Sequence, residues 1–139
     1  MRTFYIFKIN NDYYKLTKNM PYNLYKALLN IKLGTKENIT YLKNEYNSLV
    51  DKYNKIELNK YIYGKMSKLD GYNLFNSVHT FNSYYTNEAS KLIVNNSYMI
   101  LKTNTITPYF LDYLEDIPNL FLIDFEKGDY FYLSNLINI

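Results

Sequence analysis

The apolar residues of this chain follow two spacings, one typical of helices and one typical of strands. In residues 21–31 and 39–56 they recur at every third or fourth position, which places them on one face of a helix. Other segments are short runs, rich in aromatic and β-branched residues and bounded by turn-forming residues, which is typical of strands. These runs cover residues 3–9, 90–94, 97–103, 120–125 and 130–133. The mixture of both kinds predicts an α+β fold.

Capping residues set the predicted limits of the first two helices. Asn19 is expected to cap a helix from Pro21 to Ile31, which Gly34 stops. Thr35 is expected to cap a longer helix with one continuous apolar stripe. The stripe consists of Ile39, Leu42, Tyr46, Leu49, Tyr53 and Ile56. It is too short for a coiled coil, so packing on a sheet is favoured.

The segments between these elements and the C-terminal hairpins give weaker signals. Residues 58–69 favour a third helix. Residues 13–18 fit either a short strand or the approach to a helix. Residues 72–79 are loop-like and precede a possible strand at 80–85.

Turn residues predict two hairpins in the last part of the chain. Asn95 and Asn96 are interpreted as a two-residue turn, because asparagine tolerates the positive φ that such turns require. Gly128 marks the second turn. Between the hairpins, Thr107 is expected to cap a helix with Pro108 at its first position. Together the elements predict a single α+β domain, with a mainly antiparallel sheet of about five strands and helices packed on one face.

The composition narrows the class of protein. A length of 139 residues suits one domain, which we expect to cover residues 1–139. The absence of cysteine excludes disulfide scaffolds and thiolate chemistry. No apolar run approaches the ~20 residues that span a bilayer, and the opening MRTFYIFKINND has no cleavage site of a signal peptide. We therefore expect a cytoplasmic protein with no membrane association.

Few residues offer catalytic chemistry. His79 is the only histidine and has no serine or cysteine motif, so we interpret it as a solvated loop residue. Asp112, Glu115 and Asp116 have the spacing of a solvated helix side, and Asp124 is interpreted as an outward-facing strand position. These interpretations predict a protein that is not an enzyme and binds no metal or cofactor. The alternative is an acyltransferase-like enzyme or small-ligand binder that uses Asp124 in a sheet-edge cleft.

A nucleic-acid-binding module is the second alternative. Residues 1–68 hold thirteen basic and five acidic side chains, against three and eight in residues 69–139. Lysine clusters among exposed aromatic residues are typical of nucleic-acid binding. Arginine, which most often clamps phosphates and reads bases, occurs only at Arg2, so direct nucleic-acid binding is not favoured.

Four segments resemble the SirA family, the sporulation inhibitors of replication of low-GC Gram-positive bacteria. They are FYIFKINNDYYKL, YLKNEYNSLVDKYNKI, SKLIVNNSYMIL and PNLFLIDFEKGDYFYLSN. The order of these elements is similar over nearly the whole chain. The resemblance implies a non-enzymatic regulator, a monomer that forms a heterodimer with the N-terminal domain of the replication initiator DnaA and inhibits initiation.

The resemblance also implies a partner-binding face. The aromatic positions that follow the first strand in the family map first onto Tyr13, with Tyr14 beside it. The next aromatic position maps onto Thr17, where this chain has no aromatic ring. A polar position late in the second helix maps near Lys52, and the exit of the last strand maps onto Asn135, in YLSN where the family tends to show WLNP. The two tyrosines stand beside a turn, where they fit either a partner contact or cover for the sheet edge.

Overall fold

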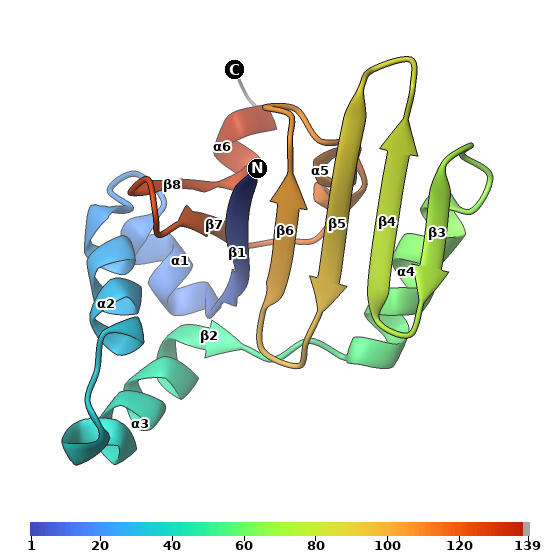
Figure 1. The fold of residues 1–139 in the computed structure, drawn as a ribbon. Coiled ribbons are helices and arrows are strands. Elements are labelled where there is room, and N and C mark those ends of the chain that lie inside the picture. Colours follow the sequence, from blue (N-terminus) through green and yellow to red (C-terminus); the bar gives the residue numbers. More distant parts are fainter. Residues whose placement is uncertain (138–139) are drawn as a thin grey trace.

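One antiparallel sheet organises the computed structural model, which describes residues 1–137 (Figure 1). Its strands are β1 (Arg2–Ile9), β2 (Val50–Asp51), β3 (Tyr72–Phe75), β4 (Val78–Ser83), β5 (Glu88–Val94), β6 (Met99–Thr103), β7 (Leu120–Asp124) and β8 (Asp129–Tyr132). They lie in the order β3-β4-β5-β6-β1-β7-β8, and β2 pairs with the end of β1. The α+β class and the antiparallel sheet are confirmed, but the sheet has eight strands and not about five.

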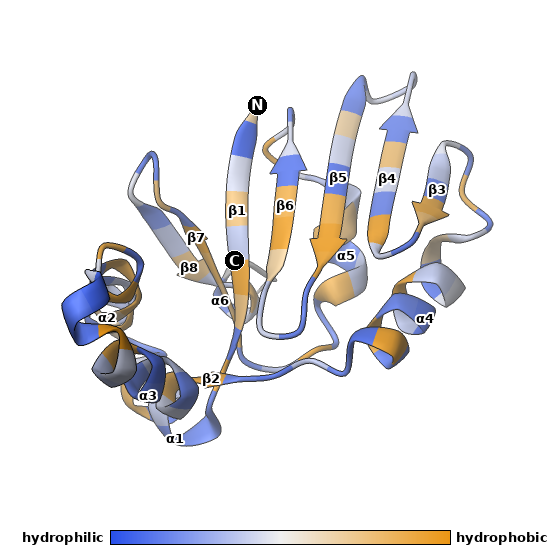
Figure 2. Cartoon of the chain, turned by 60° about the horizontal axis from the view of Figure 1, so that its bottom comes forward, coloured by the Kyte–Doolittle hydropathy of each residue, from blue (hydrophilic) through white to orange (hydrophobic). Residues whose placement is uncertain are grey.

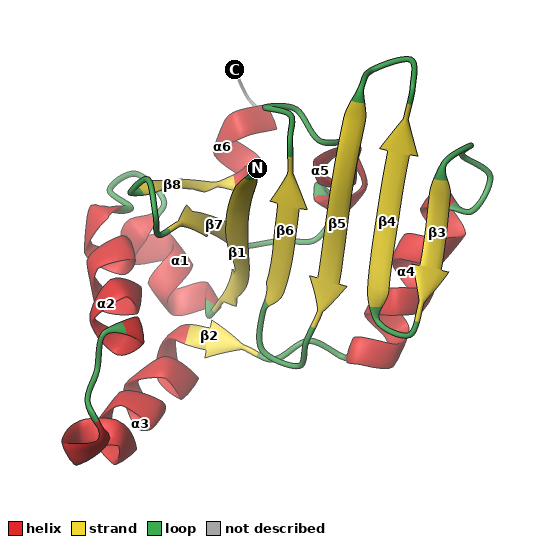
Figure 3. Ribbon diagram, viewed as in Figure 1, coloured by secondary structure: helices red, strands yellow, loops and turns green. Residues whose placement is uncertain are grey.

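Helices cover both faces of this sheet, so the prediction of helices on one face is wrong (Figure 3). The helices are α1 (Asn11–Thr17), α2 (Tyr22–Lys32), the 3-10 turn η1 (Lys36–Asn38), α3 (Ile39–Leu49), α4 (Lys55–Met66), α5 (Tyr109–Leu114) and α6 (Leu133–Ile137). α4 and α5 pack on one face, and α1, α2 and α3 pack on the other. The periodicity of a helix shows which of its sides is apolar, but it does not show which face of a sheet receives that side.

The first strand supplies side chains to a core on each face. Successive side chains of a strand point to opposite faces, so Phe4 and Ile6 enter the core under α4 and α5, while Phe7 and Ile9 enter the core under α2 and α3. β6 and β7 pair with β1 on its two sides. β1 is therefore an inner strand of the sheet that is covered on both faces.

The second predicted helix ends earlier than its apolar stripe. α3 stops at Leu49, and the next two residues form β2, which pairs with Lys8 and Ile9 of β1. Tyr53, two residues farther on, lies in the core of the opposite face, and its hydroxyl donates a hydrogen bond to the carbonyl of Ile6 at 3.1 Å. Pairing of Val50 with Ile9, 41 residues away along the sequence, thus overrides the local helical period.

Several turn and cap predictions are corrected by the backbone. Asn95 and Asn96 do not form a two-residue turn, because β5 and β6 join through four residues closed by the Asn95 amide and the Tyr98 carbonyl at 3.0 Å. Residues 72–79 are not a loop but contain β3 and the start of β4. The predicted turn at Gly128 is confirmed, with φ of 72°.

The predicted cap at Asn19 is also wrong. α2 begins at Tyr22, and Pro21 is its N-cap residue, without a side-chain hydrogen bond. Asparagine caps the preceding helix instead, where the Asn10 side chain accepts a hydrogen bond from the Asp12 amide at 3.0 Å. The ambiguous segment 13–18 therefore belongs mostly to a helix, α1, whose start is satisfied by its own cap.

Candidate protein-binding surface

The inner side of α1 is fixed to the edge strand β8. The Thr17 hydroxyl donates to the Tyr13 carbonyl at 2.6 Å and lies 2.7 Å from the Tyr132 hydroxyl, which donates to it. The Tyr14 ring meets the Tyr132 ring edge-on, with 5.0 Å between centroids. Tyr132 is fully buried, and this burial raises the pKa of its hydroxyl to about 12, so the ring stays neutral at physiological pH. The contacts hold a helix of only seven residues in one orientation.

The outer side of α1 presents apolar side chains to solvent. Tyr13 is 37% exposed, Leu16 76% and Met20 71%. Tyr13 and Leu16 are neighbours three residues apart on the helix, and Met20 follows in the next turn, with its amide bonded to the Thr17 carbonyl at 3.1 Å. We call Tyr13, Leu16 and Met20, with the flanking Lys18, the α1 surface. Clustered exposed apolar side chains of this kind mark interaction sites.

Two sequence-predicted residues come from segments far from α1 in the sequence. Asn135 donates from its side-chain amide to the Lys18 carbonyl at 3.2 Å, beyond the C-terminal end of the helix. Lys52 is exposed and follows β2, and the preceding Leu49 carbonyl accepts the Asn10 amide at 2.8 Å, next to the N-terminal end of the helix. Asn135 thus lies beside the end of α1, whereas Lys52 lies three residues beyond the bond between Leu49 and Asn10 and has no hydrogen bond or ion pair with the helix in the described part.

The sequence-predicted aromatic positions have different environments. Tyr13 lies at the surface, Tyr14 is half-buried, and Thr17 is buried with an exposure of 9%. Thr17 is therefore placed to support the surface from below through Tyr132. Leu16 and Met20 were not predicted as site residues, because their segment gave no clear helical or strand period from which exposure could be inferred.

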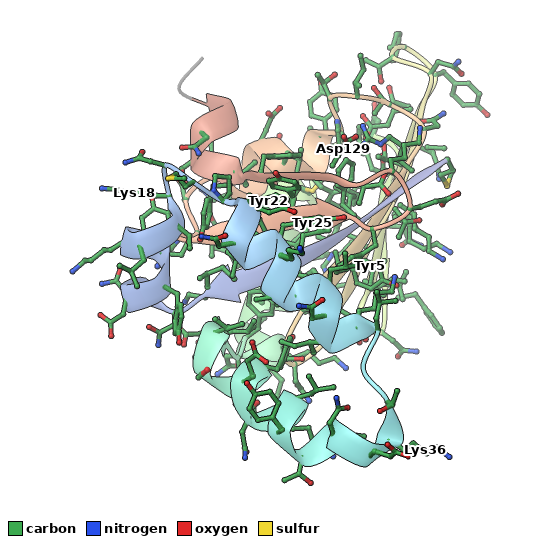
Figure 4. The ribbon with its side chains drawn as sticks, turned by 90° about the vertical axis from the view of Figure 1, so that its left-hand side faces the viewer. Tyr5, Lys18, Tyr22, Tyr25, Lys36 and Asp129 are labelled. Carbon is green, nitrogen blue, oxygen red and sulfur yellow. The ribbon has the colours of Figure 1, made fainter. Side chains whose placement is uncertain are left out.

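A tyrosine cluster extends from the α1 surface along α2. Tyr25 stacks on Tyr130 of β8 at 4.5 Å with an interplanar angle of 15°, and Tyr22, 51% exposed, lies 6.5 Å from Tyr25. Figure 4 shows Tyr22 and Tyr25 on α2 and Lys18 beyond the start of that helix. The cluster ties α2 to the same edge strand that holds α1, so both helices share one rigid support.

His79 is not the solvated loop residue that the sequence suggested. It lies in β4 and is fully buried. Its Nδ1 is 2.7 Å from the Tyr72 hydroxyl and its Nε2 is 2.8 Å from Asn59 Oδ1. Burial lowers the pKa of His79 to about 4, so the imidazole is neutral at physiological pH. Both nitrogens are engaged by protein groups, which gives His79 a structural role in the core.

Asp124 is not an outward-facing residue either. It is 2% exposed and pairs with Arg2, whose Nε lies 3.1 Å from its Oδ2. Its Oδ1 accepts the Lys127 amide at 3.1 Å, which closes the turn before β8. Arg2 also pairs with Asp129 across the same hairpin. Because its carboxylate is compensated on both oxygens, Asp124 fastens the chain start to the last hairpin.

The remaining candidate groups offer no assembled reaction site. Asp112, Glu115 and Asp116 are exposed around α5, as predicted. Within residues 1–137, no three His, Asp or Glu side chains are grouped closely enough to hold a metal ion. No helix in that range is both long and apolar enough to cross a membrane.

The comparisons with family models and curated proteins identify no relative of this chain. No protein-family model matches the chain, and no curated protein matches it significantly.

Proposed function

We propose that this protein is a non-enzymatic regulator that binds the N-terminal domain of the replication initiator DnaA and restrains initiation during sporulation. The observation that carries the proposal is the α1 surface, where Tyr13 and Leu16 are exposed on a helix whose other side is anchored and Met20 is exposed just beyond its end. The SirA resemblance puts the partner-binding face at this segment. An exposed apolar surface on a preorganised helix binds a partner without a large ordering cost.

The residues around α1 fit the rim of such an interface. Lys15, Lys18 and Lys52 are exposed, and Asn135 lies beside Lys18. Binding energy in interfaces concentrates in central aromatic and apolar anchors, whereas rim charges mainly affect association rate and salt dependence. We therefore assign Tyr13 and Leu16 to the centre and the lysines to the rim, with an acidic surface expected on the partner.

The catalytic alternative gains no support from the site geometry. Asp124, on which an acyltransferase-like activity would depend, is bonded to Arg2 and to the Lys127 amide. His79, the one imidazole, is bonded on both nitrogens inside the core. Neither group is free to take a proton from a bound substrate.

The proposal is tested by isothermal titration of the chain with the purified DnaA N-terminal domain. Tyr13→Ala is expected to weaken binding by about 2 kcal/mol or more, roughly thirtyfold, as for an interface anchor. Its free energy of unfolding should change by no more than about 0.5 kcal/mol, as for surface sites. Tyr85→Ala is the matched control, since Tyr85 is 99% exposed in the turn between β4 and β5, and it should leave binding unchanged.

Four further results test the proposal and separate it from its alternatives. Lys52→Ala should weaken the same interaction less than Tyr13→Ala and make it less sensitive to salt. Absence of binding by the unmodified chain would refute the DnaA proposal. Binding that Tyr13→Ala and Leu16→Ala leave intact would remove the α1 surface from it. Tight binding to duplex DNA that falls steeply with salt would instead favour the nucleic-acid alternative.

A further inference from the structure

A groove lies at the end of α2 that is distant from the α1 surface. Between the C-terminal end of α2, α3 and the sheet is a groove of about 370 Å³. We call it the aromatic groove; its walls include Tyr5, Phe7, Tyr46, Tyr98, Phe125 and Lys32. Figure 4 shows Tyr5 beside the end of α2 that is distant from Lys18. The groove is thus separate from the α1 surface.

The helices α2 and α3 cover only part of their face of the sheet. α2 and α3 pack over β1, β7 and β8, and no helix of the described part lies over the same face of β4, β5 and β6 (Figures 1 and 2). From Tyr5 the cross-strand partners on that face are Ile100, Ile93 and Val78, which continue the apolar floor away from the groove. The groove therefore opens onto an accessible surface and is not a closed packing defect.

The walls of the groove are held in place by contacts of their own. The Tyr46 hydroxyl donates to the Ser97 carbonyl at 3.0 Å, which ties α3 to the β5–β6 turn. The Tyr5 ring packs against Tyr98 at 5.9 Å and against Phe125 at 5.5 Å, both in tilted or edge-on arrangements. These rings contact one another at the walls without filling the space between them. A preformed, mainly apolar site of a few hundred Å³ with few polar groups is typical of small-ligand binding.

Lys32 is the only charged residue that lines the aromatic groove. Its Nζ lies 4.3 Å from the centre of the Phe125 ring and 5.3 Å from that of Tyr5. The ion pairs of the described residues involve only Arg2 with its two aspartates, so no carboxylate of this part of the chain neutralises Lys32. A neighbouring groove, which shares Ile31 and Tyr46, is also lined by lysines without acidic residues.

This charge arrangement decides which ligand the groove prefers. A group of aromatic rings by itself would favour a cationic ligand. Here the Lys32 ammonium already lies over two of the rings, so a second cation would meet a like charge. An anionic headgroup would instead gain a charge-assisted hydrogen bond from Lys32 while its apolar body covers the rings.

We propose that the aromatic groove binds an amphiphilic carboxylate, with its alkyl chain against the rings and its carboxylate paired with Lys32. Binding requires no covalent step. Because affinity comes from both parts, each pair of added methylene groups should tighten binding by roughly tenfold until the groove is full. The site does not depend on the proposed DnaA interaction, and either can fail without the other.

Titration with sodium decanoate, kept below its micelle concentration, tests the proposal by calorimetry and by chemical shifts of the groove tyrosines. The unmodified chain should bind decanoate roughly tenfold more tightly than octanoate. Lys32→Met, which keeps the length of the side chain and removes its charge, should weaken decanoate binding about tenfold. Lys26→Met is the matched control, because Lys26 lies on the same helix over the Tyr22 ring at 5.9 Å and outside the groove. It should leave binding unchanged.

Three results would overturn the proposal. The first is no saturable decanoate binding by the unmodified chain. The second is equal decanoate affinity of the Lys32→Met and unmodified proteins, when their melting temperatures agree and both are folded. The third is tighter binding of decyltrimethylammonium than of decanoate by the unmodified chain, which would assign the rings to a cation.

Discussion

The buried His79 makes a specific prediction about the pH dependence of stability. Asn59 donates from its side-chain nitrogen to Ser77 Oγ at 3.1 Å, so its oxygen faces His79 Nε2 and accepts a hydrogen bond from it. Nδ1 then carries no proton and accepts from the Tyr72 hydroxyl. The folded protein therefore holds the neutral tautomer with Nε2 protonated, and an added proton would place a charge in the core.

The size of the effect follows from the two pKa values. His79 has a pKa of about 4 in the folded chain and about 6.5 when unfolded. Between these values the unfolded state binds more protons, so stability is fully present above about pH 6.5 and declines as the pH falls towards 4. The decline is about 2 kcal/mol at pH 5 and about 3 kcal/mol at pH 4. This is a large share of the ~5–15 kcal/mol that stabilises a typical domain.

Urea denaturation at pH 7.5, 6 and 5 measures this decline. Unfolding is monitored by circular dichroism, because the chain lacks tryptophan. His79→Gln is the control: it removes the titrating group, and the difference between the two pH profiles cancels the contribution of the carboxylates. The variant should lose about 2 kcal/mol less than the unmodified chain between pH 7.5 and 5. Identical profiles, or a histidine resonance that titrates near pH 6.5 in the folded protein, would refute the reasoning.

Two further predictions concern the fold. Gly71→Ala should destabilise the chain by more than about 1 kcal/mol, because Gly71 has φ of 90° and an added Cβ would lie 1.9 Å from the Asn82 carbonyl oxygen. Gly64→Ala should instead stabilise the chain by up to about 1 kcal/mol, because Gly64 lies within α4 and an added Cβ would meet open space. Thermal melts of both variants test the pair, and equal effects would contradict it. Thr17→Val should lower the free energy of unfolding, measured by urea denaturation, by about 1–3 kcal/mol, because it leaves the Tyr132 hydroxyl without its partner. Adding Tyr132→Phe should recover part of that loss. No recovery would mean that the Thr17–Tyr132 hydrogen bond is not its cause.

Local sequence signals predicted the elements that depend on nearby residues. The first strand, the helix from Tyr22, the helix after Asn54 and the last hairpin at Gly128 all occur close to their predicted positions. In each case the spacing or run of apolar residues lies within one element, so local sequence was enough to indicate it.

Contacts between distant residues decided the features that the sequence did not predict. β2 forms because Val50 finds a partner in Ile9, and α1 takes its place because Thr17 and Tyr14 meet Tyr132, more than a hundred residues away. Leu16 is exposed on the α1 surface only through that placement, because fixing one side of α1 leaves the other exposed.

The same reason explains the wrong environments of His79 and Asp124. A polar residue in an apolar run fits either an exposed position or a buried one with partners, and the run itself does not distinguish them. Asn59 and Tyr72 satisfy His79, and Arg2 neutralises Asp124 from the opposite end of the chain. The sequence determined which segments could become helices and strands, whereas tertiary pairing determined which polar groups could be buried, because burial is stable only where a distant partner completes the hydrogen bond or the charge.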